Sequence, residues 1–364
     1  MSTPLHTLFG LPESQAPLLF LAPMAGYTNA PMRRICHQHG AALTFTEMVS
    51  DLGLLHTSDK TWYLLENLPD EGPVVAHLYG ANPSSMAEAA ARIERTRRFV
   101  GIDVNSGCPV TKVIRSGCGA ALIKDPQRIH DILHAMRRSI KIPLTLKTRV
   151  GPYPDKIAIF DILAAAESAG ANALTLHGRF TSQGHAGTVH LDLIGEVKAR
   201  AKIPIIGNGG ICSPYDAWRM LHETKVDALM IARAAIGNPW IFSDIRTALE
   251  TATEPDFRPK TSGRIRRDLA DIQTIFHQHL RDEQDFVTRV RSKYELPLTS
   301  EEIEQTLATT FRCNLFRYFH SLKGSSYLRA NLQMIHTLKG IHEAVKGCLE
   351  REAAYRAKDP RQQT

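Results

Sequence analysis

The sequence predicts an α/β fold, a TIM (β/α)8 barrel, followed by a small C-terminal all-α domain. Eight short runs of aliphatic and β-branched residues precede position 240, and segments with the apolar spacing of amphipathic helices lie between them. Eight strands alternating with helices over this length favour a closed parallel barrel. A doubly wound sheet is the structural alternative, but no predicted strand is followed by the GxGxxG pattern of that fold.

The predicted elements alternate regularly along the first 240 residues. We predict strands over residues 18–25, 42–49, 74–79, 101–105, 144–149, 173–177, 203–208 and 228–233. Helices that would lay an apolar face on this sheet are predicted at residues 84–96, 126–139, 157–169, 191–201 and 214–223. Residues 1–250 are therefore predicted to form one barrel domain.

The region after the barrel changes in character. Residues 251–263 contain Pro255, Pro259 and Gly263, which is typical of a linker. Residues 264–364 are predicted to form a helical domain, with helical patterns over 264–293 and 301–349. A capping-box start at Thr299 and Glu302 supports the second of these helices.

The composition is that of a globular protein without membrane or disulfide elements. Hydrophobic residues make up 43% of the chain, and the apolar stretches are too short and too often interrupted to span a bilayer. The first residues lack the basic start of a signal peptide, so we expect a cytoplasmic protein. The six cysteines show no CxxC or zinc-ligand spacing, and we therefore expect a reduced chain with no structural metal.

Positive charge is concentrated in the last third of the chain. The formal net charge is +7 at pH 7, residues 256–364 hold 19 Lys and Arg against 14 Asp and Glu, and residues 305–342 contain no acidic residue. This basic segment, residues 305–342, is a candidate surface for the phosphates of a polyanionic partner. The alternative is a solvated helix face that happens to be basic.

Nearly every predicted strand is apolar until its last positions, and there or just beyond it carries residues typical of a functional site. In a barrel the C-terminal ends of all strands meet on one rim, where the active sites of this fold lie. A single strand-end residue would be an ordinary packing residue, but convergence from every strand predicts a functional site. These residues are Pro23, Met24, Ala25, Glu47, His77, Asn105, Cys108, Lys147, Arg149, His177, Arg179, Asn208 and Arg233.

Cys108 follows the fourth predicted strand in the segment Asn105-Ser106-Gly107-Cys108-Pro109. A glycine before the thiol and a proline after it restrict the backbone, so the side chain is held in place. This is a way to mount a reactive group. The alternative is a small buried hydrophobe, which is what most free cysteines are.

The loops after strands seven and eight predict a phosphate site. Gly209 and Gly210 follow Asn208 and let backbone N–H groups approach an oxyanion, while Arg233, after Ala232, supplies a countercharge. An ordinary turn is the alternative for the glycines alone.

Lys147 ends the fifth predicted strand. A fixed cation at this position can stabilise negative charge on a reduced flavin ring. The alternative is an ion pair with a neighbouring strand-end acid such as Glu47.

Six segments in register resemble the tRNA-dihydrouridine synthases, with the bacterial B-type branch the most similar. They are LAPMAGYTN (21–29), NSGCP (105–109), LKTRVG (146–151), HGR (177–179), NGG (208–210) and ARAAIGNPW (232–240). Their order and spacing match over roughly residues 17–245. The C-terminal region resembles the helical RNA-binding domain of that family only loosely, through Phe311, Arg312 and the basic residues that follow.

The resemblance implies an FMN-bound barrel that takes hydride from NADPH and reduces uridines of tRNA to 5,6-dihydrouridine. Hydride would pass from FMN to C6 of the base, and Cys108 would act as the general acid that protonates C5. The residues implied to bind the cofactor are Pro23, Met24, Ala25, His77, Lys147, His177, Asn208, Gly209, Gly210, Ala232 and Arg233. Those implied to meet the substrate are Asn105, Lys112, Arg115, Arg149 and Arg179.

His77 departs from the family pattern, which usually has glutamine at this position. A glutamine amide both donates to and accepts from the pyrimidine edge of a flavin. A neutral imidazole can also do both, with one function on each nitrogen. We therefore expect His77 to contact the cofactor, with an altered affinity or potential.

The RNA would present an extruded base to the barrel, because C5 and C6 of a stacked uridine are out of reach. The aromatic residues Tyr318, Phe319 and Tyr327 lie within the basic segment and are candidates for base stacking, although their helical spacing also fits a core. We expect tRNA as the partner, ribosomal RNA being the open alternative, and a monomer.

Two other functions fit parts of the sequence. An FMN-dependent barrel oxidoreductase of a small molecule, similar to dihydroorotate dehydrogenases or enoate reductases, would explain the barrel and its phosphate loops but not the basic helical region. A non-catalytic RNA-binding protein on a barrel scaffold would not need a full set of rim residues.

Overall fold

A computed structural model describes residues 3–13, 16–56, 59–251, 265, 267–294 and 299–358. The chain divides into two compact units, one of residues 1–235 and 240–265 and the other of residues 236–239 and 266–364. Apart from residue 251, the predicted linker lies outside the described residues. Within the described ranges, no helix combines the length and the apolar character that crossing a membrane requires.

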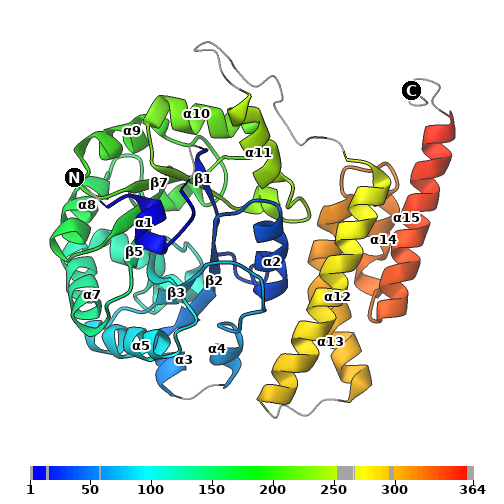
Figure 1. The fold of residues 1–364 in the computed structure, drawn as a ribbon, viewed down its shortest axis with the longest axis horizontal. Helices are drawn as coiled ribbons and strands as arrows, with labels where there is room; N and C mark the ends of the chain where they lie inside the picture. Colours follow the sequence, from blue (N-terminus) through cyan, green and yellow to red (C-terminus); the bar gives the residue numbers. More distant parts are fainter. Residues whose placement is uncertain are drawn as a thin grey trace. The chain divides into compact units, whose positions relative to one another are not determined.

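Eight parallel strands close into a barrel in sequence order, and β8 pairs with β1 (Figure 1). This confirms the predicted fold class and excludes the doubly wound alternative. The strand β1 ends at Leu21 rather than at residue 25, because Pro23 has no N–H for a ladder and residues 24–28 form a turn. The bounds are β1 (Leu18–Leu21), β2 (Leu43–Ser50), β3 (Val74–Tyr79), β4 (Gly101–Ser106), β5 (Leu144–Arg149), β6 (Ala173–His177), β7 (Ile205–Asn208) and β8 (Ala228–Ile231).

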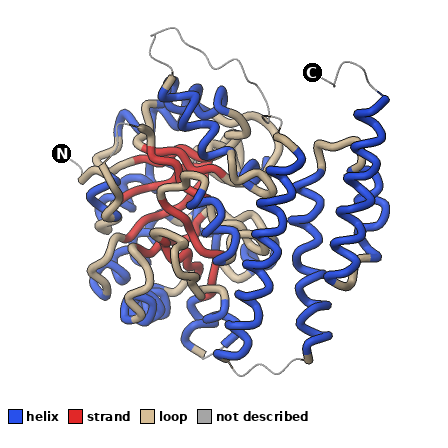
Figure 2. Tube along the Cα trace, turned by 45° about the vertical axis from the view of Figure 1, so that its right-hand side comes forward, coloured by secondary structure: helices blue, strands red, loops and turns tan. Residues whose placement is uncertain are grey.

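Helices surround the strands on all sides of the barrel (Figure 2). Three of them begin with proline after Asn82, Asp125 or Ser213, whose side chains accept hydrogen bonds from N–H groups of the first turn. The α-helices of this unit are α1 (Leu5–Phe9), α2 (Ala30–Gln38), α3 (Asp51–Leu55), α4 (Asp59–Tyr63), α5 (Pro83–Arg95), α6 (Thr111–Arg115), α7 (Pro126–Ser139), α8 (Ile159–Ser168), α9 (Leu191–Arg200), α10 (Pro214–Thr224) and α11 (Ile241–Glu250). Short 3₁₀ helices are η1 (Gly119–Lys124), η2 (Thr181–Gln183) and η3 (Arg233–Ala235).

Alternate residues of each strand face opposite sides of the sheet, and both sides are buried. Ala76 and Leu78 of β3 belong to the large cluster between strands and helices, whereas Val75 belongs to a second cluster inside the barrel. That inner cluster also contains Leu5 and Phe9 of α1, so the N-terminal helix packs against the interior at the N-terminal end of the strands. The C-terminal end carries the polar residues.

The second unit is helical, as predicted, with a capping box between Thr299 and Glu302. The helical pattern over 301–349 contains more than one helix, since one ends at Phe319 and the next begins at Ser325. Between them lies Gly324, where an added Cβ would lie 2.1 Å from the Cys348 carbonyl oxygen. The elements are α12 (Leu269–Lys293), α13 (Ser300–Phe319), α14 (Ser325–Asn331), η4 (Leu332–Met334) and α15 (Leu338–Lys358).

Candidate functional site

The predicted rim residues of β4 to β7 lie in neighbouring register positions. Lys147 pairs in register with Asn105 on β4 and with Thr175 on β6. His177 pairs with Asn208 on β7. The Lys147 ammonium donates to the Asn208 amide oxygen at 3.0 Å, so this hydrogen bond joins β5 to β7 past the intervening strand.

The turn that carries Cys108 is fixed from three sides. The Asn105 amide oxygen accepts hydrogen bonds from the backbone N–H groups of Gly107 and Cys108, each at 3.0 Å. Arg149 Nε donates to the Gly107 carbonyl at 2.8 Å. Gly119 has a φ of +59°, and an added Cβ would lie 3.2 Å from Cys108 Cβ. Cys108 is partly exposed, so its hydrogen-bonded turn holds in place a residue that is not fully buried.

Three arginines tie residues 180–187, the loop after β6, to the ends of β5, β6 and β8. All donate to backbone carbonyls of the loop at 2.7–3.2 Å: Arg149 to Phe180 and Gly184, Arg179 to Gly187, and Arg233 to His185. Arg149 is almost fully buried and also holds the cysteine turn. The family resemblance implies that Arg149 and Arg179 contact the substrate. In the structure both side chains bind backbone carbonyls of the protein and position its loops.

Positive charge converges on two histidines at this rim. Burial and the nearby cations Lys147, Arg149 and Arg179 hold the pKa of His177 well below its ordinary value. Arg179 Nη1 lies 3.4 Å from His177 Nε2, which is consistent with a neutral imidazole that accepts at Nε2. His185 stacks on His177 with ring centroids 6.3 Å apart, and its pKa is also lowered by burial and the same cations.

Burial also acts on the basic side chains themselves. It lowers the pKa of Lys147 to about 8, assisted by the neighbouring Arg149 charge and opposed by Asp103 and Cys108. The pKa of Arg149 falls to about 10 for the same primary reason, with Arg179 as the repelling neighbour. The alternative ion pair between Lys147 and Glu47 is not present among the described residues.

The glycines after β7 have the conformation expected of a backbone that approaches a ligand. Gly209 has a φ of +108° and Gly210 a φ of +73°, values that side chains rarely permit. An added Cβ on Gly209 would lie 2.5 Å from the His177 ring, so glycine is required here for steric reasons also. Arg233 is exposed beside Ala232 at the start of η3.

His77 is buried on β3 and pairs with an acid on the next strand. Its Nδ1 lies 2.7 Å from Asp103 Oδ2, and its backbone N–H donates to Thr46 Oγ1 at 2.9 Å. Sequence reasoning missed Asp103, although its position could have been inferred. It lies at an inward position of β4, two residues before Asn105, where an acid between Ile102 and Val104 stands out.

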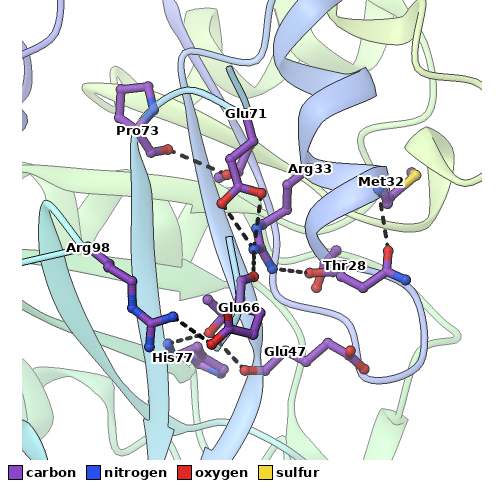
Figure 3. Close-up of polar contacts among 12 residues, drawn as sticks. Thr28, Met32, Arg33, Glu47, Glu66, Glu71, Pro73, His77 and Arg98 are labelled. Carbon is purple, nitrogen blue, oxygen red and sulfur yellow. Dashed lines mark hydrogen bonds and ion pairs between the residues drawn. The ribbon is translucent and has the colours of Figure 1, made fainter. Parts of the chain in front are cut away.

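A buried cation on α2, Arg33, binds Thr28 (Figure 3), which closes the turn over residues 24–28 that follows Pro23. The Arg33 guanidinium is fully buried and donates to the Thr28 carbonyl at 2.8 Å, and to both Glu71 carboxylate oxygens at 3.2 Å. Gly26, next in the turn, donates its N–H to Glu47 Oε1. Burial raises the pKa of Glu47, with the Gly26 hydrogen bond opposing the shift.

The remaining predicted contacts lie on exposed surfaces or in the core. Lys112 and Arg115 are exposed on α6, directly after the cysteine turn. In the second unit, Tyr318 and Phe319 are fully buried, so their interpretation as base-stacking residues is wrong and the core alternative holds. Basic side chains of residues 305–342 are mostly exposed: Arg317, Lys323, Arg329 and Lys339 are exposed and Arg312 is half-buried.

Two further rim residues were absent from the sequence analysis. His185 was not identified, because a histidine in a glycine-containing loop gives no signal of the three arginine contacts that place it. Thr175 lies at an inward position of β6, and its hydroxyl is buried with no hydrogen-bond partner in the parts of the chain that the structure describes. The strand alternation alone would have marked this polar position.

Comparisons with known proteins give one consistent result. The family model described as "Dihydrouridine synthase (Dus)" matches residues 20–354. The chain is 37% identical to tRNA-dihydrouridine synthase B of Proteus vulgaris, over 76% of this chain and 84% of the relative. It is also 37% identical to tRNA-dihydrouridine synthase B of Escherichia coli K12, over 74% of this chain and 80% of the relative.

The solved structures extend the likeness at the level of fold. An amine oxidase of 6-hydroxypseudooxynicotine from Pseudomonas geniculata N1 aligns with a TM-score of 0.50 at 13% identity. The alignment covers 69% of this chain and 51% of the oxidase, so the chain spans about half of that protein's length.

Proposed function

The chain belongs to the dihydrouridine synthase family, and on that premise we propose that it reduces uridines of tRNA to 5,6-dihydrouridine with bound FMN and NADPH as reductant. The family match extends from β1 into α15. The observation that carries the proposal is the fixed turn of Cys108 beside a cationic rim. An acid group and a phosphate-binding loop on one barrel rim are what this reaction requires.

The residues at the rim fit a flavin mononucleotide. Gly209 and Gly210 add no side chain over their backbone N–H groups, which can bind a phosphate, and exposed Arg233 supplies positive charge there. The Thr175 hydroxyl and the Lys147 ammonium supply polar groups in the barrel interior. The contacts proposed for the cofactor are Pro23, Met24, Ala25, His77, Lys147, His177, Asn208, Gly209, Gly210, Ala232 and Arg233.

Each residue near the base has a role that follows from its chemistry. When bound and reduced, FMN supplies the hydride for C6 of the uracil ring. The Cys108 thiol donates a proton to C5, because it carries an S–H group and its turn holds it at a set position. Asn105 holds that turn, and Lys112 and Arg115 on α6 meet phosphates beside the extruded nucleotide.

We also propose the cellular setting that this function requires. The exposed basic residues of 305–342 hold the tRNA backbone. The enzyme works in the cytoplasm as a monomer, which light scattering of the purified protein tests directly.

The decisive experiment measures the product. The purified, FMN-loaded protein is incubated with NADPH and unmodified tRNA, the RNA is digested, and dihydrouridine is quantified by mass spectrometry. Cys108→Ala should bind FMN and accept hydride from NADPH as the natural protein does. Its yield of dihydrouridine should fall by about 10²–10⁴-fold, the usual contribution of a general acid.

The matched control is Cys212→Ala, because Cys212 is an exposed cysteine in the loop after β7. Its product yield should equal that of the natural protein. Normal turnover by Cys108→Ala removes the thiol from the mechanism. If NADPH reduces the FMN-loaded protein but no dihydrouridine forms, the protein is instead a flavin reductase of a small molecule.

A further inference from the structure

A continuous line of buried hydrogen bonds crosses β2 to β5. The Thr145 hydroxyl donates to Asp103 Oδ1 at 2.5 Å, and the other carboxylate oxygen lies 2.7 Å from His77 Nδ1. The His77 backbone N–H donates to Thr46 Oγ1 at 2.9 Å. All four residues are at most 3% exposed. A polar chain at this depth is strongly constrained, because each unpaired member would cost the free energy of its lost hydration.

The chain determines which ring nitrogen of His77 carries the proton. An ionised carboxylate is only an acceptor, and the Thr145 hydroxyl donates to one of its oxygens. Facing a carboxylate that only accepts, the ring nitrogen near the other oxygen is the donor, Nδ1–H. In an imidazole that carries one proton, Nε2 is then a hydrogen-bond acceptor. Nε2 has no partner within the residues that the structure describes.

His77 lies between the inner apolar cluster and the rim. Val75, the preceding inward residue of β3, belongs to the inner apolar cluster. His77 lies one inward position further along the strand, and its register partner Asp103 lies one inward position before Asn105. The pair therefore forms the layer directly below Asn105 and the Cys108 turn.

We propose that Asp103 is a positioning residue for the flavin: it holds His77 in the Nδ1–H tautomer, so that Nε2 accepts a hydrogen bond from the flavin ring. The only hydrogen-bond donor on the oxidised isoalloxazine ring system is its pyrimidine N–H, which makes an acceptor on the protein the complementary partner. This inference rests on the proposed flavin function. At this position the family usually has a glutamine, whose amide both donates and accepts. In this chain a histidine takes its place, and Asp103 determines which of its ring nitrogens donates and which accepts.

The alternative role for Asp103 is that of a counter-ion for Lys147. Asp103 does raise the pKa of Lys147, but burial dominates and the net shift is downward. The Lys147 ammonium donates to Asn208, and no ion pair joins it to Asp103 among the described residues. The direct partners of the carboxylate are His77 and Thr145.

The first experiment reads the tautomer directly. Protein labelled with ¹⁵N-histidine is examined by long-range ¹H–¹⁵N correlation, and the His77 signals are assigned by their absence in His77→Gln. We expect a protonated Nδ1 and an unprotonated Nε2 in the natural protein. In Asp103→Asn an amide N–H can face Nδ1, which shifts the proton to Nε2 in part or in full. A purely structural role of Asp103 would leave the tautomer unchanged.

The second experiment measures FMN affinity in a double-mutant cycle. FMN fluorescence is titrated with apoprotein of the natural chain, Asp103→Asn, His77→Gln and the double variant. Asp103→Asn should raise the Kd of FMN about tenfold, which corresponds to the loss of one hydrogen bond. In the His77→Gln background the same substitution should change the Kd less than twofold, because Asp103 acts through the imidazole.

Each outcome bears on the inference. Protonation of Nε2 in the natural protein, or an equal effect of Asp103→Asn in both backgrounds, overturns it. If Asp103→Asn does not fold, Thr145→Val removes one donor to the carboxylate and should raise the Kd in the same direction by two- to fivefold; an unchanged Kd overturns the inference. Failure of the natural protein to bind FMN refutes the proposed function separately, since the tautomer is measured without flavin.

Discussion

The two ends of the barrel interior are built by the same strands but have opposite chemistry. At the N-terminal end, Phe20, Phe45 and Val75 pack with α1 in a fully apolar cluster. Two residues beyond Val75, the inward position of β3 holds His77, which is level with Asp103. One inward position further, level with Asn105, β5 holds Lys147. One sheet thus provides a stabilising end and a reactive end.

The difference extends to free energy. Burial at the rim lowers the pKa of Lys147 to about 8 and that of Arg149 to about 10, which means that the fold disfavours their charged forms. No such cost exists in the apolar layer. Burial of these cations is therefore unfavourable, and packing in the rest of the barrel offsets its free energy. Substitutions that remove buried groups at the two ends should change the free energy of unfolding in opposite directions.

The largest effect on stability is expected at the apolar end. Phe45 is fully buried and packs against Phe20 with ring centroids 6.5 Å apart. Phe45→Ala should reduce the free energy of unfolding by about 3–5 kcal/mol through lost burial and a residual cavity. Urea unfolding followed by tryptophan fluorescence measures this, because the three tryptophans of the chain, Trp62, Trp218 and Trp240, belong to the barrel unit.

The same variant tests whether the two ends are separable. Under native conditions Phe45→Ala should bind FMN with an unchanged Kd, since its cavity lies in the layer away from the rim. Leu52→Ala, at an exposed position on α3, is the matched control and should change stability by less than about 0.5 kcal/mol. A loss of FMN affinity as large as the loss of stability would show that the layers act as one.

A smaller effect of opposite sign is expected at the rim. Lys147→Met keeps the length of the side chain but removes a charge whose burial is unfavourable. Without FMN, the variant should be more stable than the natural protein at pH 7 by about 1–2 kcal/mol. This gain in the free energy of unfolding is smaller than the free energy that corresponds to the full pKa shift. Lys147 is only partly buried, and the substitution also removes its hydrogen bond to Asn208.

The pH dependence of this gain has a definite sign. An unfolded lysine keeps its proton up to about pH 10.4, whereas the folded one releases it near pH 8, so the unfolded state binds more protons in between. The natural protein should therefore gain stability as pH rises from 8 toward 10, and the advantage of Lys147→Met should shrink. The exposed Lys141→Met is the control. An advantage that grows with pH would contradict the assignment.

Much of the site could be predicted because it depends on strand ends. Apolar runs marked the eight strands, and a parallel barrel brings their C-terminal residues together whatever the details of the loops. Lys147, His177 and Asn208 follow from this geometry alone. The fold class followed from the same alternation of strands and helices.

Contacts made through the backbone could not be predicted. The three arginines that hold residues 180–187 bind carbonyl oxygens, which every residue type possesses, so no side-chain pattern reveals them. Near Gly324 the chain approaches Cys348, 24 positions later, so closely that an added Cβ would clash. Both features involve residues that are distant in sequence, and local propensity does not reveal such contacts.

The smallest effect on the free energy of unfolding is expected at Thr175, where a single hydroxyl group tests the difference between the apolar end and the rim. The Thr175 hydroxyl lies inside the barrel beside Lys147 in register and lacks a hydrogen-bond partner in the described chain. Thr175→Val has nearly the same shape and removes a buried polar group that gains nothing from the fold. Without FMN it should raise the free energy of unfolding by about 1 kcal/mol, measured by urea unfolding.

If the hydroxyl belongs to the cofactor site, the substitution that stabilises the protein without FMN should weaken the binding of FMN. The Kd of FMN for Thr175→Val should rise by two- to tenfold, because one hydrogen bond is lost on binding. Thr148→Val is a useful contrast on β5, since the Thr148 hydroxyl already donates to the Ser106 carbonyl at 3.2 Å. That variant should lose stability and keep its FMN affinity. A destabilised Thr175→Val would mean that the hydroxyl has a partner inside the protein, and the rim would then be less open to a ligand than its chemistry indicates.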